Sequence, residues 1–404
     1  MSQALEGVNV VEFAAYAAGP GITKYLADHG ATAVHVESGT RPDGFRVNYP
    51  PFKDNVTGLN RSGCFSIFNN NKLGAMLNLK TEAGLELARR LVAWSDVVIE
   101  NFTPGTMKRL GLDYESLKTI RPDVIMLSTC NHGQTGPHAK HPGFGTQLSS
   151  LAGFTNLTGY PGGPPMILYG PYIDFVAVAL GLVAVAAALD HRRRTGRGQY
   201  IDLSQYESGL QFIAPTLLDA RINRRVATRS GNRAAAAAPH GAYPCRGEDR
   251  WCALSVWSDE EWERLVAVMG HPAWATVERF RTLRGRKQHE AELDRLIGQW
   301  TREHDADLLM ERLRAQGLRG GVVRTMPELF TDPQLSHRGI WWPMEHREMG
   351  SHHYKAPPFI LRKSPAKPTR PAPCLGEHNR EVFVGLLGMT EGEFSALSAS
   401  GVIA

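Results

Sequence analysis

The chain has 404 residues, enough for two domains of ordinary size. Hydrophobic residues make up 42% and charged residues 21%, which is typical of a soluble globular protein. The formal charge of +5 is a small excess for this length, so it suits an anionic small molecule and argues against nucleic-acid or membrane-surface binding.

The first 21 residues lack the basic start and apolar core of a signal peptide, so we expect none. The five cysteines are scattered and form no C-x-x-C pair, which argues against a disulfide framework or a zinc site and favours a reducing cytoplasm. An apolar run of fifteen residues separates Asp174 from Asp190. A bilayer needs about 20 such residues, so we expect a buried helix here and no membrane segment.

The first third of the chain alternates predicted strands with helices. We expect strands over residues 7–14, 32–38, 96–101 and 123–130, and helices over 22–30, 81–95 and 114–122. This order predicts a parallel sheet with right-handed crossovers. The turn after the first strand lacks G-x-G-x-x-G and contains Pro20, so the sequence does not favour a dinucleotide cofactor.

Beyond residue 205 the pattern changes. A polar connection over 219–233 precedes a predicted strand–turn–strand unit and three helices. A proline-rich stretch over 352–379 is typical of an extended linker, and the end is helical again.

Two clusters have obvious but weak functional interpretations. His132, His138 and His141 lie within ten residues, but no carboxylate flanks them, so we predict no metal site. The basic segment 191–199, HRRRTGRGQ, could bind phosphate, but we interpret it as a structural turn before a strand.

Six segments in order resemble one family, the class III CoA-transferases (CaiB/BaiF family). They are VVEFAAYAAGP, FNNNKLGAMLNLKTEAG, DVVIENFTPGTMKRLGLDYESL, GQTGP, PYIDF and HRRRTGRGQYIDLSQYE. The match covers most of residues 5–250 and continues weakly to the end. Any single segment would be weak evidence for the family, whereas six segments in the same order are specific to it.

The resemblance implies an α/β fold with a Rossmann-like large domain built from both termini, a small α/β domain, and an interlocked homodimer in which two chains pass through each other. We therefore expect a large domain over 1–205 with 376–404 returning to it. A linker over 206–230, a small domain over 231–330 and an extended linker over 331–375 complete the chain.

Asp174 stands at the front of the apolar run, and the resemblance implies that it is the catalytic nucleophile. It would carry the acyl group as an anhydride and then CoA as a thioester. The dipole of the following helix would favour its ionised form, and the apolar surroundings would exclude water. The alternative is that Asp174 is only a helix N-cap, a position that Asp commonly occupies.

CoA needs cations, backbone donors and flat apolar surface. The positions that match the family's CoA-binding motifs are Tyr16, Ala17, Ala18, Arg46, Lys72, Asn101, Phe102 and Arg109. Lys72 and Arg109 could instead be solvated surface charges, and Arg41 lies in the same loop as Arg46. CoA would be a substrate here, and we expect no tightly bound cofactor.

The sequence departs from the family at two places. Some members have a Glu that hydrogen-bonds the catalytic Asp, where this chain has Gly145, and the glycine-rich flap of some members is absent. Gln147 or His240 could replace the missing Glu.

We predict a cytoplasmic CoA-transferase that acts on an acyl-CoA and a carboxylic acid whose identities the sequence leaves open. One alternative is an α-methylacyl-CoA racemase of the same fold, although its catalytic His is missing from GFG at 143–145. The other is a non-catalytic CoA-binding subunit.

Overall fold

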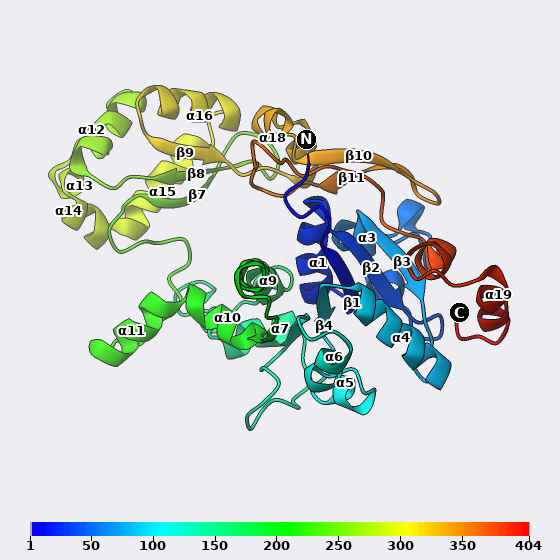
Figure 1. The fold of residues 1–404 in the computed structure, drawn as a ribbon. Coiled ribbons are helices and arrows are strands. Elements are labelled where there is room, and N and C mark those ends of the chain that lie inside the picture. Colours follow the sequence, from blue (N-terminus) through cyan, green and yellow to red (C-terminus); the bar gives the residue numbers. More distant parts are fainter. Residues whose placement is uncertain (1, 404) are drawn as a thin grey trace. The chain divides into compact units, whose positions relative to one another are not determined.

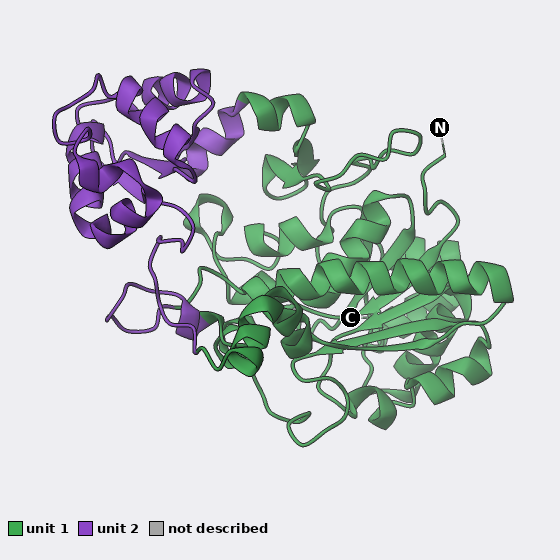
Figure 2. Ribbon diagram, turned by 90° about the vertical axis from the view of Figure 1, so that its left-hand side faces the viewer, with its two compact units in different colours: residues 1–154, 167–225, 333–404 green, residues 155–166, 226–332 purple. Residues whose placement is uncertain are grey.

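The computed structural model describes residues 2–403, which form two compact units (Figure 2). Unit 1 consists of the residues up to 154, residues 167–225 and the residues from 333 onward. Unit 2 consists of residues 155–166 and 226–332. Both ends of the described chain therefore belong to unit 1.

The centre of unit 1 is a six-stranded sheet in which every neighbouring pair of strands is parallel. Its strands are β1 (Asn9–Phe13), β2 (Thr32–Glu37), β3 (Lys72–Met76), β4 (Val97–Glu100), β5 (Ile125–Cys130) and β6 (Tyr200–Ser204). The order β3-β2-β1-β4-β5-β6 reverses direction between β1 and β4. Ligands of such sheets bind at this switch point, outside the carboxyl ends of the strands. The predicted parallel α/β sheet is confirmed, although no strand was predicted at β3.

Helices cover both faces of this sheet (Figure 1). Helices α1 (Ala18–Asp28) and α9 (Tyr172–Thr195) pack on one face. Helices α4 (Glu82–Trp94) and α6 (Tyr114–Ile120), with the C-terminal helices η2 (Glu381–Leu386) and α19 (Glu391–Ala399), cover the other. A Cβ at Gly21 would lie 2.6 Å from Val178, and one at Gly181 would lie 2.4 Å from Ile22. These glycines let α1 and α9 approach closely, which places the first turn of α9 beside the start of α1.

Helix α9 is longer and less buried than the sequence predicted. It is the one helix of the described chain that is long and apolar enough to cross a membrane, and 33% of its most apolar window is buried. Core helices of soluble proteins pass the same test, so this finding carries little weight. The expected buried helix is therefore confirmed only in part, because α9 packs on the sheet along one side and leaves Phe175, Leu180 and Val183 exposed.

Several further elements of unit 1 lie in segments where the sequence predicted no complete helix or strand. They are α2 (Gly44–Val47), α3 (Gly63–Asn69), α5 (Thr106–Arg109), α7 (Gly145–Leu151), α10 (Gln205–Phe212), α11 (Ala214–Ile222), α18 (Pro333–Arg338), and the antiparallel pair β10 (Trp341–His346) and β11 (Gly350–Lys355). The expected linker 206–230 thus contains two helices, and the expected extended linker 331–375 contains a helix and a β-hairpin.

Unit 2 has a core of its own around an antiparallel sheet. Its strands are β7 (His240–Pro244), β8 (Trp251–Ser255) and β9 (Arg319–Val322). Its main helices are α12 (Asp259–Val268), α15 (Glu290–Thr301) and α16 (Ala306–Ala315). The predicted strand–turn–strand unit and the three helices agree with this arrangement.

Candidate active site

Asp174 lies in the first turn of α9 but does not cap the helix. The N-cap is Pro171, and the backbone N–H of Asp174 donates to the Pro171 carbonyl at 3.0 Å. The interpretation of Asp174 as an N-cap is therefore wrong. A carboxylate one turn into the helix still benefits from the helix dipole, but its side chain satisfies no backbone donor.

The carboxyl group of Asp174 is mostly, but not fully, removed from water and lacks a protein partner. Over residues 2–403 no hydrogen bond or ion pair to this carboxyl is found. Burial raises the pKa of Asp174 from its ordinary value near 3.8 to about 7. Both ionisation states are therefore populated near neutral pH. An acid with so perturbed a pKa, at the start of a helix that packs beside α1, is a candidate for chemistry.

Gly145, the first residue of α7, lies directly against this carboxyl. A Cβ at position 145 would come within 2.5 Å of Oδ2 of Asp174 and within 2.7 Å of Pro171 Cβ. No side chain fits there without moving the carboxyl. Of the two suggested replacements for the missing Glu, Gln147 accepts the Phe144 N–H at 3.0 Å and does not bond Asp174. His240 belongs to unit 2, where its ring contacts the Asn232 carbonyl.

Aromatic side chains link Asp174 to the switch point. Phe175 packs on Phe68 at 5.9 Å between ring centroids, Phe68 on Phe45 at 5.5 Å, Phe45 on Tyr16 at 5.4 Å, and Tyr16 on Phe144 at 5.6 Å. Phe144 precedes Gly145 in the chain, so the series begins and ends beside Asp174. We call these five residues the aromatic belt, and it gives the site apolar walls.

The turn between β1 and α1 supplies the residues predicted to touch CoA. Tyr16 has a left-handed backbone (φ 65°), and its N–H donates to the Asp43 carboxylate at 3.0 Å. Ala17 is the N-cap of α1, where no side chain caps the helix, and Ala18 is its first residue. Asn101 accepts from the Ala15 N–H at 3.0 Å and donates to the Ala15 carbonyl at 2.7 Å, which ties the carboxyl ends of β1 and β4 together.

The segment after β4 places Phe102 and Arg109. The Phe102 N–H donates to Glu100 at 2.8 Å, and its ring packs against the core. Arg109 in α5 is exposed and donates to Thr106 Oγ1 at 2.8 Å. Since its guanidinium has no acidic partner within the part of the chain that is described, it has donors free for an anion.

Lys72 and Arg46 are not where the sequence placed them. The Lys72 ammonium is fully buried and donates to Glu12 at 3.0 Å, to the Pro20 carbonyl at 2.9 Å and to Asn69 at 2.9 Å. Arg46 is also fully buried, with its guanidinium bonded to Glu37 at 2.7 Å. The predicted CoA contacts of both cations, and the alternative of a solvated charge at Lys72, are corrected because neither side chain reaches solvent or has a donor left for a ligand.

His35 joins these pairs into one buried network between Glu12 and Glu37. Burial alone would lower the pKa of His35, but the two carboxylates raise it to about 9. The sequence held one signal for this network: Glu12 and Glu37 interrupt strands that are otherwise apolar, and a buried charge requires a partner.

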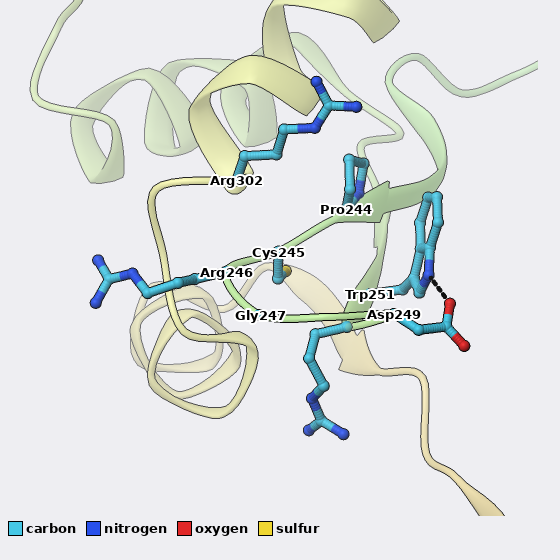
Figure 3. A pocket seen from close by; sticks show the side chains of 8 residues that line it. Pro244, Cys245, Arg246, Gly247, Asp249, Trp251 and Arg302 are labelled. Carbon is cyan, nitrogen blue, oxygen red and sulfur yellow. Dashed lines mark hydrogen bonds between the residues drawn. The ribbon is translucent and has the colours of Figure 1, made fainter.

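The other clusters carry no site. Within residues 2–403 no group of three or more His, Cys, Asp or Glu side chains could hold a metal ion, although His138 and His141 rings lie 4.6 Å apart. In the basic segment 191–199, Arg192 forms an ion pair with Asp96 at 2.8 Å, which agrees with the predicted structural role of this segment. Figure 3 shows a pocket of about 330 Å³ in unit 2, where burial raises the pKa of the Cys245 thiol, so it holds no activated nucleophile.

Comparison with known proteins agrees with the fold and identifies the family. The model of CoA-transferase family III matches residues 5–379. Succinyl-CoA–D-citramalate CoA-transferase of Chloroflexus aurantiacus is 32% identical over 400 residues, which is 99% of this chain and 98% of that protein. Succinate–glutarate CoA-transferase of Agrobacterium fabrum is 33% identical over 383 residues, or 95% of each chain. A CaiB/BaiF family protein from Brucella suis has a similar structure, with a TM-score of 0.88, 31% identity, and coverage of 96% of this chain and 100% of that one.

The family model and these relatives match nearly the whole chain, and the relatives named for an activity transfer CoA, so the chain is placed in the class of CoA-transferases. The chain belongs to CoA-transferase family III. The predicted family and enzyme class are confirmed.

Proposed function

We propose that this enzyme moves CoA from an acyl-CoA to a carboxylic acid through covalent intermediates on Asp174. The Asp174 carboxylate attacks the thioester carbonyl, which forms a mixed anhydride and releases CoA thiolate. The thiolate attacks the aspartyl carbonyl, which leaves an aspartyl-CoA thioester and the free donor acid. The acceptor carboxylate then attacks that thioester, and the returning thiolate yields the new acyl-CoA and regenerates Asp174.

The desolvated Asp174 carboxyl is the observation that supports this proposal best. Burial that raises its pKa to about 7 penalises the anion. The anhydride and the thioester at the same position are neutral, so they escape this penalty. Apolar walls formed by the aromatic belt also limit hydrolysis of the anhydride. The site thus destabilises the resting carboxylate relative to the covalent states.

CoA would bind along the carboxyl ends of β1 and β4. Its phosphates would meet the uncapped start of α1 at Ala17 and Ala18, beside Tyr16, and the exposed guanidinium of Arg109. Asn101 would hold that turn in place, and Phe102 would border it. Lys72 and Arg46 would have a structural role, because their buried ion pairs with Glu12 and Glu37 hold in place the strands that lead into the turn.

The donor acid is proposed from the relatives. Two of them are named for succinyl-CoA or succinate, so succinyl-CoA is the first donor to test, with short dicarboxylic acids as acceptors. We further propose that the enzyme is cytoplasmic.

We also propose an interlocked homodimer. Large apolar side chains of α9, α10 and α11 are exposed, among them Val183 at 66%, Phe212 at 60% and Ile222 at 72%. An apolar surface of this kind is typical of a protein interface. Sedimentation at falling protein concentration should show no folded monomer, because interlocked chains separate only on unfolding.

Mass spectrometry of the intact protein tests the mechanism. Incubation with succinyl-CoA alone should add the mass of CoA less one water to the chain, and hydroxylamine should remove the CoA. Asp174→Asn should give neither adduct nor turnover, whereas Asp190→Asn in the same helix should give both. Uptake of α-deuterium from deuterated water without an acceptor acid would instead indicate a racemase. An Asp174→Asn variant that retains activity without deamidation would exclude Asp174 as the nucleophile.

A further inference from the structure

A lysine from the C-terminal hairpin lies on the aromatic belt. Lys355 is the last residue of β11, and its ammonium stands over two belt rings, 4.9 Å from the centroid of Phe68 and 5.2 Å from that of Phe175. Phe175 is the neighbour of Asp174 in the first turn of α9. A segment about 180 residues away in sequence thus brings a positive charge to the helix turn that carries the proposed nucleophile.

This ammonium has no anionic partner of its own. Lys355 is partly buried, and among the described residues no hydrogen bond or ion pair to its Nζ is found. The Asp28 carboxylate, which attracts it from a distance, already binds the Lys24 ammonium and accepts from Asn70 at 3.0 Å and Asn71 at 2.7 Å. Lys24 in turn donates to the Lys355 carbonyl at 3.0 Å, so the backbone of Lys355 is anchored while its ammonium is not.

An unpaired cation in such surroundings is costly. Burial and the nearby Lys24 charge lower the pKa of Lys355 to about 8, so the group is still mostly protonated at pH 7. Aromatic faces attract an ammonium, but they replace its lost hydration only in part. The Lys355 ammonium therefore lacks a negatively charged hydrogen-bond acceptor.

The surroundings determine which anion fits. A single ammonium between two apolar rings offers one charge and a few donors, which suits a carboxylate on a short methylene chain. A phosphate dianion usually requires several cations or backbone donors together. We propose that Lys355 binds the second carboxylate of a dicarboxylic acyl group while the other carboxyl group of that acid reacts at Asp174. This inference rests on the proposed nucleophile and adds to it a residue that selects dicarboxylic substrates.

The test compares substrates that differ only in the second carboxylate. Transferase kinetics would be measured for succinate and butyrate as acceptors with a common acyl-CoA donor. The enzymes would be wild type, Lys355→Met, Lys355→Arg and, as a matched control, Lys363→Met, which removes an exposed charge from the same part of the chain.

The proposal predicts a change in selectivity. Lys355→Met should raise the KM for succinate about tenfold or more, as expected for loss of a charge-assisted hydrogen bond, with a much smaller change in kcat. The kcat/KM ratio of succinate over butyrate should fall by the same factor. Lys355→Arg should restore most of this ratio, and Lys363→Met should leave it unchanged.

Three results would overturn the proposal. The ratio of succinate over butyrate could stay unchanged in Lys355→Met, which would make Lys355 a packing residue held by the rings. Wild type could fail to prefer succinate. The KM for the acyl-CoA donor could rise instead, with no such rise for the matching acyl-dephospho-CoA, which would assign Lys355 to the 3′-phosphate of CoA. All three results are measured on enzymes that turn over. They can therefore be told apart from a wrong nucleophile, which the adduct experiment with Asp174→Asn would show.

Discussion

Replacing Asp174 with Asn should stabilise the protein at alkaline pH and have much less effect at acidic pH. In the folded protein the pKa of Asp174 is about 7, against an ordinary value near 3.8. Because the folded state holds this proton more tightly, wild-type stability falls as pH rises from about 3.8 and becomes constant above about 7. Asn has nearly the same shape and never ionises, so the variant lacks this loss.

The size of the effect follows from the two pKa values. Between pH 5 and pH 8.5 the unfolded carboxyl is ionised throughout, whereas the folded one loses its proton near pH 7. About two pH units separate pH 5 from that point, and each is worth about 1.4 kcal/mol, which gives about 3 kcal/mol. The carboxyl keeps some contact with water, so we take about 1–3 kcal/mol as the expected gain of the variant over wild type.

Urea unfolding of both proteins at pH 5, 7 and 8.5, at one protein concentration, measures this difference. Other titrating groups cancel because only position 174 differs. Asp190→Asn provides the control: Asp190 is exposed in the same helix, and hydrogen bonds from Arg193 and Arg194 lower its pKa, so its replacement should not stabilise at high pH. A stability difference between Asp174→Asn and wild type that does not change with pH would show that the carboxyl is hydrated, and the reasoning would be wrong.

Four further predictions concern catalysis, CoA binding and the buried charges. If ionised Asp174 is the attacking group, kcat/KM should fall about tenfold per pH unit below pH 6 and level off above about pH 8, which initial rates across this range would show. Gly145→Ala should cut kcat by an order of magnitude or more with circular dichroism unchanged, because its Cβ would displace the Asp174 carboxyl; unchanged turnover would refute the steric argument. Arg109→Ala should raise the KM for acyl-CoA with kcat and stability nearly constant. Lys72→Met should instead lower the free energy of unfolding by about 3–5 kcal/mol, because it leaves Glu12 buried without its main partner. A stability loss in Arg109→Ala together with a changed KM but unchanged stability in Lys72→Met would contradict the structure.

The sequence was a good guide where a signal is local. Alternating strands and helices over residues 9–130 follow from periodicity and capping residues, such as Thr81, which caps α4. Asp174 was predicted to be the nucleophile because family motifs flank it. The hairpin β10–β11 was missed because neighbouring prolines are typical of extended chain, and its pairing depends on contacts that no local pattern encodes.

Long-range pairing explains the other errors. Lys72 looks like any surface lysine, and only folding shows that Glu12, sixty residues earlier, neutralises it inside the sheet. Lys355 is the opposite case, since it looks equally ordinary and folding leaves it without a partner. Whether a charge is satisfied depends on three-dimensional contacts, so a sequence can suggest that a buried charge exists but not which charges remain open to a ligand.

The same reasoning accounts for Gly145 in place of the family's Glu. A Glu hydrogen-bonded to the nucleophile would need space that the Asp174 carboxyl itself occupies, because even a Cβ at this position would lie 2.5 Å from Oδ2. Without that partner, the surroundings of Asp174 are set by burial alone, and burial raises its pKa to about 7. The penalty on the anion disappears when the carboxyl becomes an anhydride or a thioester. Under the proposed mechanism, Asp174 would therefore react because no protein group stabilises its anion, and Lys355 on the aromatic belt would bind the second carboxylate of the substrate.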